Sequence, residues 1–254
     1  MTRSAATNQS VAPTELTHGH LLAGRVEYAQ PALGFRSGIE PVLLAAAVPA
    51  RPGERALEAG SGAGAALLCL ATRVPRIEGL GIERDPSLVA VARRNAEANH
   101  ASGLSFLAED ITAKAIVGPF DHALANPPYH PHGGTASPSA DQERAKRGHA
   151  GLLAGWASAL ASPLRHRGSL TFILPAASLA ECLVAMSQAG CQPAAVLPLW
   201  PKQGRAAKLI LLQAIKGGRS SLRLLAGLTL HESNGAFTPA AEAILRCGTP
   251  LHLS

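Results

Sequence analysis

The sequence predicts an α/β protein whose core is a doubly wound, mostly parallel sheet of seven strands. Three observations support this prediction. Short apolar strand candidates alternate with apolar helix candidates from residue 55 onward, a pattern typical of parallel sheets. A glycine-rich turn, LEAGSGAG at residues 57–64, follows the first of these strands. The last two strand candidates have no helix between them, which predicts an antiparallel hairpin at one edge of the sheet.

The chain before this alternation has a different character. Residues 1–20 are polar and are expected to form a flexible N-terminal tail. Residues 21–38 mix glycine, proline and apolar residues and could hold a short hairpin. Residues 39–49 (IEPVLLAAAVP) predict an apolar helix that stops near Pro52 and Gly53, because proline and glycine interrupt helices.

The alternating region and the end of the chain complete one predicted domain, residues 21–254. The seven strands are expected at residues 55–58, 79–83, 104–108, 120–125, 169–174, 196–200 and 208–215. The helices between them are expected at residues 63–72, 86–99, 148–161 and 176–190. Asp85 and Pro86 suit the N-cap and the first position of the second helix. Residues 217–254 are expected to add a short strand pair and a last helix at 239–246.

Composition excludes several classes of protein. Of the 254 residues, 47% are hydrophobic, which is enough for a sizeable core. The longest apolar stretch, residues 41–50, is about half the length that a membrane-spanning helix needs. The polar N-terminus lacks the apolar segment of a secretion signal. The four cysteines have no CxxC spacing, so we expect neither a disulfide scaffold nor a metal site, and the cytoplasm is the expected compartment.

The charge is unevenly distributed along the chain. Residues 1–143 carry 11 Lys and Arg against 14 Asp and Glu, whereas residues 144–254 carry 12 against 3. The formal net charge of +6 therefore comes from the second part. A basic region behind a near-neutral one favours a polyanionic partner such as nucleic acid. Cationic residues that only aid solubility would give the same count.

The glycine-rich turn has the features of a nucleotide-binding loop. Gly60, Gly62 and Gly64 follow a strand and open a helix, so the backbone there can approach a ligand that a Cβ would obstruct. Glu83 ends the second strand, where a carboxylate can accept hydrogen bonds from two ribose hydroxyls. A dinucleotide fold also fits, since Gly60, Gly62 and Ala65 approximate its GxGxxA signature.

Two further acidic residues separate the nucleotide interpretations. Glu58 ends the first strand, where it would repel a pyrophosphate but attract the amino group of a methionine moiety. Asp110 follows the third strand, where a carboxylate can accept a hydrogen bond from an adenine amino group. Acids at three consecutive strand ends favour S-adenosylmethionine, a cationic sulfonium cofactor, over NAD.

The fourth strand ends in a stiff tetrapeptide, Asn126-Pro127-Pro128-Tyr129. The side-chain oxygen of Asn126 and the carbonyl oxygen of Pro127 can each accept one N–H of a planar amino group. These two bonds favour a tetrahedral nitrogen and stabilise the positive charge that develops on it. Tyr129 can stack on the ring that carries this nitrogen. The tetrapeptide therefore predicts methylation of a flat, poorly nucleophilic amino group.

The motifs LEAGSGAG, GIERD, AEDI and NPPY, in this order, resemble those of the class I S-adenosylmethionine-dependent methyltransferases that methylate amino groups. The flanking segments GFRSGIEPVLLAAAVP, ADQERA with His149, and FTPAAE are similar to the bacterial tRNA adenine-N6 methyltransferases, which modify the adenine next to the anticodon of a valine tRNA. This resemblance covers about residues 24–246 and implies a Rossmann-like fold.

The resemblance implies a set of site residues. The cofactor would be held by Glu58, Gly60, Ser61, Gly62, Gly64, Glu83, Arg84, Asp110 and Asn126. The catalytic residues that hold the adenine would be Asn126, Pro127, Pro128 and Tyr129. Two basic clusters are the expected RNA contacts, one on the loop after the tetrapeptide and one at the last hairpin: Arg144, Lys146, Arg147, Lys202, Arg205 and Lys208.

The resulting hypothesis is transfer of a methyl group from S-adenosylmethionine to the exocyclic N6 of adenine in RNA. An anticodon-loop adenine of tRNA is the favoured substrate, because a loop base costs least to extrude. We expect a monomer without a metal or a membrane partner. Three alternatives remain: a protein glutamine-N5 methyltransferase, which uses the same tetrapeptide but a longer N-terminal domain; an rRNA or small-molecule amine methyltransferase; and a catalytically silent RNA-binding module.

Overall fold

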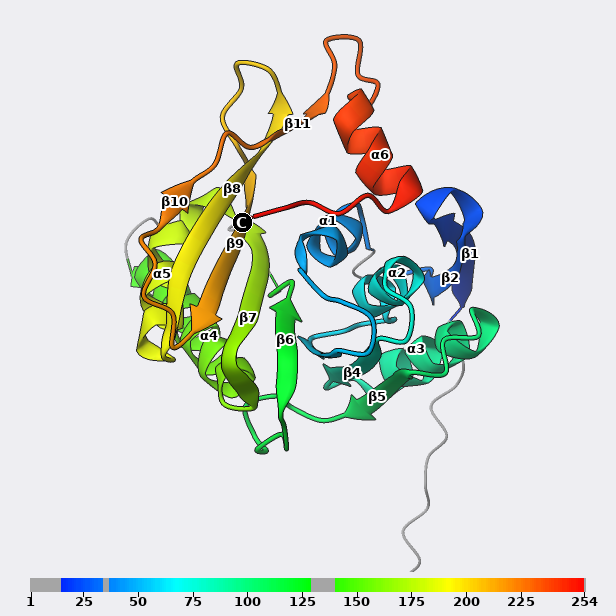
Figure 1. Ribbon diagram of the computed structural model, residues 1–254, viewed down its shortest axis with the longest axis horizontal. Helices are drawn as coiled ribbons and strands as arrows, with labels where there is room; N and C mark the ends of the chain where they lie inside the picture. The colour runs from blue at the N-terminus through cyan, green and yellow to red at the C-terminus, as the bar shows by residue number, and fades with distance from the viewer. Residues whose placement is uncertain (1–14, 34–36, 129–139, 254) are drawn as a thin grey trace, which may run out of the picture.

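The computed structural model describes residues 15–33, 37–128 and 140–253, with residues 140–150 described as backbone alone (Figure 1). A nine-stranded sheet forms the centre of the molecule. Its long strands lie in the order β5-β4-β3-β6-β7-β9-β8, and the short strands β10 and β11 both pair with β8. The long strands are β3 (Arg55–Ala59), β4 (Glu78–Glu83), β5 (Leu104–Ala108), β6 (Phe120–Ala125), β7 (Leu164–Pro175), β8 (Cys191–Lys202) and β9 (Leu209–Lys216).

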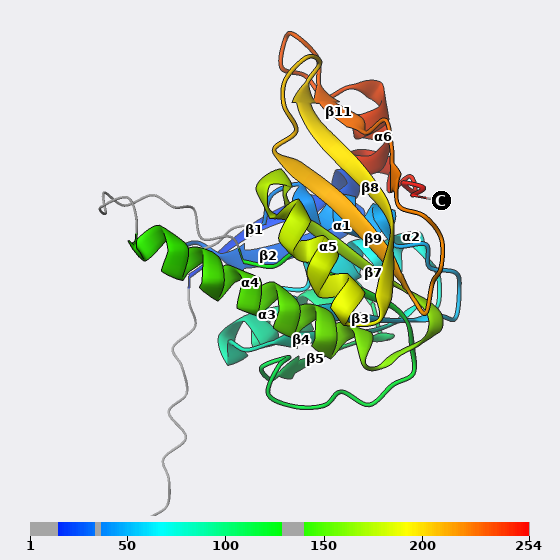
Figure 2. The same cartoon turned by 90° about the vertical axis from the view of Figure 1, so that its left-hand side faces the viewer.

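Helices cover both faces of this sheet. One face carries α1 (Glu40–Ala47), α2 (Ala65–Arg73) and α3 (Pro86–Ala98), whose apolar side chains share one core with the sheet. The other face carries α4 (Ala140–Ala161) and α5 (Leu179–Gln188), which lie side by side in Figure 2. A last helix, α6 (Pro239–Cys247), joins the first core. The predicted doubly wound architecture is therefore confirmed.

The predicted strand directions are also confirmed. Strands β3, β4, β5, β6 and β7 run parallel, and β9 runs antiparallel to both β7 and β8. The helix start predicted at Asp85 is present as well, because its carboxylate accepts a hydrogen bond of 2.8 Å from the Ser87 N–H. The strand–helix alternation and the capping carboxylate of Asp85 therefore predicted these features correctly.

Several predicted boundaries are wrong at the start of the chain and in its middle. Residues 16–20 were assigned to a flexible tail, but they belong to strand β1 (Leu16–Leu21), which forms a two-stranded hairpin with β2 (Val26–Pro31). A short 3-10 helix, η1 (Leu22–Gly24), lies between them. Helix α4 begins eight residues before the predicted residue 148, so Arg144, Lys146 and Arg147 lie on a helix rather than on a loop.

The strands at the end of the chain pair differently from the prediction. The expected strand pair after residue 217 is present as β10 (Arg223–Leu224) and β11 (Leu228–His231), but the two strands do not pair with each other. Each runs parallel to β8, at Ala195–Val196 and at Leu199–Lys202 respectively. A short 3-10 helix, η2 (Ala176–Ser178), opens the helix predicted at residues 176–190.

The carboxyl ends of the parallel strands meet at one edge of the sheet. Ala59 of β3 is in register with both Ile82 of β4 and Ala125 of β6, while Glu83 is in register with Ala108. The turn between β8 and β9 lies at the same edge, because Pro175 and Leu199 both pair with Leu209. Ligands of open α/β sheets bind at this edge, so it is where the predicted site residues must be found.

A buried polar cluster lies at the opposite, amino edge. His122 is 5% exposed, with its Nε2 at 2.8 Å from Glu54 Oε2 and its Nδ1 at 2.8 Å from Ser169 Oγ. An ionised carboxylate only accepts, so the imidazole donates from Nε2 and accepts the Ser169 hydroxyl at Nδ1. Burial lowers the pKa of His122, and the hydrogen bond from His122 lowers the pKa of Glu54 against the effect of burial.

These two shifts predict that acid destabilises the fold in two steps. Because the folded-state pKa of His122 lies below its ordinary value, the unfolded chain takes up that proton first as the pH falls through about 6.5. The lowered pKa of Glu54 removes further stability below about pH 4.5. We expect the melting temperature to fall by a few degrees between pH 7 and pH 5 in the wild type. His122→Gln should lack this first step, and parallel melting curves for the two proteins would exclude His122 as its cause.

Candidate active site

The glycine loop between β3 and α2 has a tightly constrained backbone. Gly60, Gly62 and Gly64 all have positive φ values, of 65°, 53° and 88°, a region that other residues rarely adopt. The Gly64 N–H donates to the Ser61 carbonyl oxygen at 2.8 Å, which closes the turn. A Cβ on Gly62 would meet no heavy atom within 4 Å. The loop is therefore held in shape by the protein and leaves open space at its middle glycine, as a ligand cradle requires.

Two buried polar atoms beside this loop lack a partner. Glu58 is 3% exposed, and its Oε2 makes no hydrogen bond. The Ser61 hydroxyl is also buried and makes no hydrogen bond. Burial, opposed by a hydrogen bond from the Leu67 N–H, raises the pKa of Glu58 well above its ordinary value. Unpartnered buried polar groups are rare in native proteins. They therefore mark the place where a polar, positively charged ligand group would be accommodated.

The other acidic residues stand at the next two strand ends, as predicted. Glu83 accepts hydrogen bonds from the Gly62 N–H at 3.1 Å and the Asp85 N–H at 3.0 Å, so it shapes the loop and is half-exposed beside it. Asp110 is exposed after β5, and the hydroxyl and N–H of Thr112 lower its pKa. Both residues therefore lie at the sheet edge where the glycine loop lies. Arg84 is exposed at the same edge.

The tetrapeptide begins next to the glycine loop. Ala59 and Ala125 are partners in adjacent strands, so the following residues, Gly60 and Asn126, leave the sheet side by side. Asn126 is half-buried, Pro127 is buried and Pro128 is exposed. The structure thus brings the predicted amide next to the predicted cofactor loop. Tyr129 lies outside the described residues.

The structure describes the side chains of only one of the two predicted basic clusters. Lys202, Arg205 and Lys208 are exposed on the turn between β8 and β9, at the same sheet edge as the glycine loop. In Figure 1 this turn projects at the top of the molecule, near the loop that follows β11. The Lys202 ammonium donates to the Ser233 carbonyl oxygen of that loop at 3.0 Å. The side chains of Arg144, Lys146 and Arg147 lie outside the described residues.

Sequence reasoning missed two residues that contact the glycine loop, Trp156 and Asn95, and a third, Tyr28, that interacts electrostatically with Glu58. The Trp156 ring of α4 lies over Gly60, where a Cβ would come within 2.6 Å of it. Asn95 of α3 donates to the Ala63 carbonyl oxygen at 2.9 Å. Tyr28 of β2 is buried, and burial together with the charge of Glu58 raises its pKa to about 12, against the effect of a hydrogen bond with Ser37. A signal existed for Asn95, which lies three residues after Ala92 on the apolar face of its helix.

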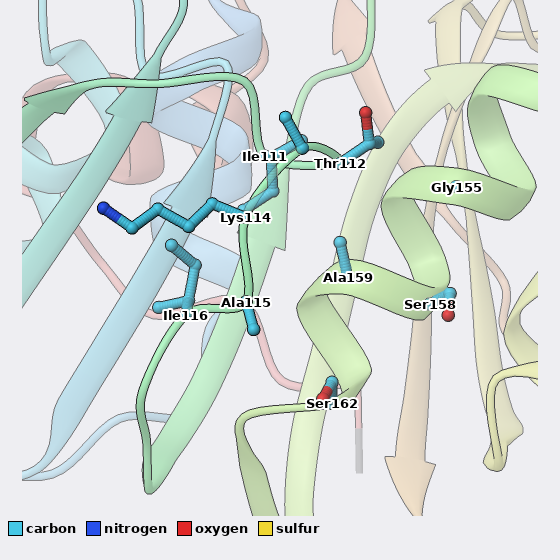
Figure 3. Close-up of a pocket in the computed structure, with 10 residues that line it drawn as sticks. Ile111, Thr112, Lys114, Ala115, Ile116, Gly155, Ser158, Ala159 and Ser162 are labelled. Atoms are coloured by element: carbon cyan, nitrogen blue, oxygen red, sulfur yellow. The ribbon is translucent and has the colours of Figure 1, made fainter.

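A pocket of about 350 Å³ lies beside the site, between the segment after β5 and helix α4 (Figure 3). Its walls include Thr112, which bonds Asp110, and Gly155, which precedes Trp156. None of the glycine-loop residues lines it. The pocket is therefore separate from the cradle that the motifs define.

The described parts of the chain hold neither a candidate metal centre nor a membrane-spanning helix. Within residues 15–33, 37–128 and 151–253, whose side chains the structure describes, no three His, Cys, Asp or Glu side chains gather as a metal would require. In the same part of the chain, no helix combines the length and apolarity needed to cross a membrane.

The chain is similar in sequence to known methyltransferases. Residues 40–147 match the family described as "Methyltransferase small domain". The chain is 27% identical over 229 residues to the tRNA1(Val) (adenine(37)-N6)-methyltransferase of Aeromonas hydrophila, which covers 86% of this chain and 91% of that protein. It is 43% identical over 79 residues to the release factor glutamine methyltransferase of Rhodospirillum rubrum. That alignment spans 31% of this chain and only 24% of the length of the relative.

The fold has relatives among solved structures. A predicted O-methyltransferase of Agrobacterium tumefaciens superposes with a TM-score of 0.70 and 27% identity, covering 84% of this chain and 98% of that one. The comparisons therefore support the predicted class I methyltransferase fold.

Proposed function

We propose that the chain is an S-adenosylmethionine-dependent methyltransferase of the class I fold and that it methylates the exocyclic N6 of adenine in RNA, with tRNA as the favoured substrate. One observation carries the proposal: Asn126 and its two prolines leave the sheet directly beside the first glycine of the cofactor loop. The proposed enzyme acts as a monomer in the cytoplasm, as one domain that includes strand β1 from Leu16 onward.

The residues of the edge fit the cofactor. Glu58 offers an unpartnered buried carboxyl oxygen that would bind the ammonium of the methionine moiety. Glu83 and Asp110 would accept hydrogen bonds from the ribose hydroxyls and the adenine amino group, and the open space at Gly62 admits a close approach of the backbone. When bound, S-adenosylmethionine supplies a methyl group that is already activated by its sulfonium.

Asn126 and Pro127 supply the chemistry on the substrate side. The lone pair of an exocyclic amino group is delocalised into its ring and attacks poorly. An amide oxygen from Asn126 and the carbonyl oxygen of Pro127 would each accept one N–H, which turns the nitrogen tetrahedral and stabilises the positive charge that forms during attack. The residue before a proline is held extended, so this pair of acceptors is preorganised. Tyr129 would stack on the base.

Charge supports RNA as the carrier of this amino group. Residues 144–254 hold 12 Lys and Arg against 3 Asp and Glu, and Lys202, Arg205 and Lys208 are exposed at the cofactor edge. A tRNA methyltransferase that aligns over 86% of the chain supports the same class of substrate. The local similarity to a glutamine methyltransferase makes a protein glutamine the second candidate, since its amide is planar too.

Labelled S-adenosylmethionine distinguishes these substrates. The protein is incubated with the labelled cofactor and, separately, with bacterial tRNA, rRNA and protein fractions. We expect the label in tRNA, and nucleoside mass analysis should identify it as N6-methyladenosine. Label on glutamine in the protein fraction would replace the proposal with glutamine methylation. Label in rRNA alone, or in none of the fractions, would contradict tRNA as the substrate.

The basic turn between β8 and β9 provides a separate test of RNA binding. Arg205→Glu with Lys208→Glu should weaken tRNA binding and reduce the slope of log affinity against log salt by about 1.5, since each lost phosphate contact contributes about 0.7–0.9. Lys202 is left intact because it holds the Ser233 carbonyl. The matched control, Arg51→Glu with Arg76→Glu, reverses two exposed charges at the amino edge. Equal slopes for both double variants would remove the turn from the interface.

A further inference from the structure

Asn95 joins three parts of the molecule through one buried side chain. Asn95 is 3% exposed and lies in the last turn of α3. The amide oxygen accepts from the Ala29 N–H at 3.0 Å, and the amide nitrogen donates to the Ala29 carbonyl oxygen at 2.8 Å. The same nitrogen donates to the Ala63 carbonyl oxygen at 2.9 Å. Both N–H groups of this amide are thus used, one toward strand β2 and one toward the glycine loop.

Asn99, four residues later, bonds the backbone of β2 in the same way but makes no bond to the glycine loop. Its amide oxygen accepts from the Glu27 N–H at 2.8 Å and its amide nitrogen donates to the Glu27 carbonyl oxygen at 2.7 Å. Glu27 and Ala29 are two residues apart in β2, so their polar groups face the same side of the strand. Asn99 is the C-cap residue of α3, and its amide nitrogen also donates to the Asn95 carbonyl oxygen in the last turn of that helix. Both asparagines dock the β1–β2 hairpin, but only Asn95 extends to the glycine loop.

The bond to Ala63 matters because of where this residue lies. Ala63 is 5% exposed between Gly62 and Gly64, two positions with positive φ. Its carbonyl oxygen needs a partner inside the protein, because a buried carbonyl without one is costly. The neighbouring Gly62 N–H is held by Glu83 at 3.1 Å. The loop is therefore fixed from two sides, by Glu83 on β4 and by Asn95 on α3.

We propose that Asn95 is a positioning residue for the cofactor: it holds the glycine loop in its binding shape and couples that loop to the β1–β2 hairpin. The inference rests on the assignment of the loop to S-adenosylmethionine and not on the identity of the methylated substrate. A loop that is in the binding shape for only a fraction of the time binds with an affinity reduced by that fraction. The loss of Asn95 therefore weakens cofactor binding even though this side chain need not touch the cofactor.

The twin asparagine provides the matched control. Asn95→Ala and Asn99→Ala both remove the docking of one β2 residue, but only Asn95→Ala leaves the Ala63 carbonyl without its partner. Calorimetric titration with S-adenosylmethionine, without RNA, should give a dissociation constant raised about tenfold or more for Asn95→Ala and within about twofold of wild type for Asn99→Ala. With tRNA present, KM for the cofactor should rise in Asn95→Ala while kcat at saturating cofactor changes little.

Hydrogen exchange separates loop positioning from general destabilisation. Amides of residues 60–66 should exchange faster in Asn95→Ala than in Asn99→Ala, whereas both variants should expose the β1–β2 amides. If Asn95→Ala does not fold, Asn95→Ser takes its place, since a hydroxyl can still donate one of the two bonds. Equal cofactor affinities in the two asparagine variants would overturn the proposal. These titrations contain S-adenosylmethionine and no RNA. Such a result would therefore overturn the role of Asn95 without contradicting RNA as the methylated substrate.

Discussion

Replacing Asn126 by alanine should lower the rate constant of methyl transfer by about 10²–10³-fold, the effect typical of removing one preorganised polar group from a reacting centre. Cofactor affinity should stay within a few-fold of wild type. The reason is the position of Asn126, which is half-buried at the end of β6 and beside the glycine loop rather than part of it. Single-turnover kinetics with saturating cofactor and tRNA measures the first quantity, and calorimetric titration measures the second.

A second substitution at the same position tests the acceptor itself. Asn126→Asp keeps an oxygen that can accept the N–H, so it should retain more activity than Asn126→Ala. The exposed neighbour Pro128 provides a control, because Pro128→Ala leaves both proposed acceptors in place and should cost far less. Equal losses of methyl transfer and cofactor binding in Asn126→Ala would make Asn126 a structural residue and contradict its role at the amino group.

The fold was predictable wherever local chemistry and the tertiary structure agree. The strands at residues 104–108 and 120–125 and the helix start at Asp85 were predicted as observed, because short apolar runs and a capping carboxylate are local signals. Strand β8 was predicted five residues too short at its start, where Pro193 argues against a sheet interior, and Pro198 also lies within the strand. The structure tolerates them because Pro193 precedes the residues that pair with β10, and Pro198 lies between those that pair with β10 and with β11.

Strand β1 shows the limit of pattern reading more clearly. Its residues LTHGHL show no alternation of apolar and polar side chains, and three successive positions, 18–20, are exposed. Only pairing with β2 makes this segment a strand, and β2 is itself held by the side chains of Asn95 and Asn99 from α3. Such contacts between distant segments leave no periodic signal in the sequence.

The candidate site also contains some residues that local motifs predict and others that only contacts between distant segments reveal. The glycine loop, the acids at strand ends and the tetrapeptide were found because each is a local motif attached to a strand end. Trp156 lies over Gly60 although the two are far apart in sequence, and Asn95 reaches Ala63 across 32 residues. Neither contact could be derived without knowing which helix covers which face of the sheet.

Glu58 carries the second large prediction, in which stability and binding change in opposite directions. The carboxyl group is almost fully buried and one of its oxygens has no partner. Because its pKa is raised well above the ordinary value, the folded protein without cofactor holds a proton that the unfolded chain releases above about pH 4.5. Folding therefore loses stability at this residue as the pH rises from about 4.5 toward the folded-state pKa.

Glu58→Gln should consequently raise the melting temperature of the cofactor-free protein at pH 8 and change it little at pH 4.5. Glutamine keeps the shape and cannot ionise, so the pH-dependent loss disappears. The same substitution should weaken S-adenosylmethionine binding by about 10–100-fold, the range expected when a hydrogen bond to a charged group is lost. An ammonium placed against Glu58 favours its carboxylate, so wild-type binding should also release a proton, visible as a buffer-dependent calorimetric enthalpy.

The control for this prediction is Glu78→Gln, which removes an exposed carboxylate at the start of β4, on the opposite edge of the sheet. It should change neither the cofactor affinity nor the pH dependence of the melting temperature. If Glu58→Gln lowered stability and left affinity unchanged, the carboxylate would serve the α2 N-terminus through its bond from Leu67 and not the cofactor. The opposite signs expected for stability and binding are what a merely structural glutamate could not produce, because a structural role would lose both together.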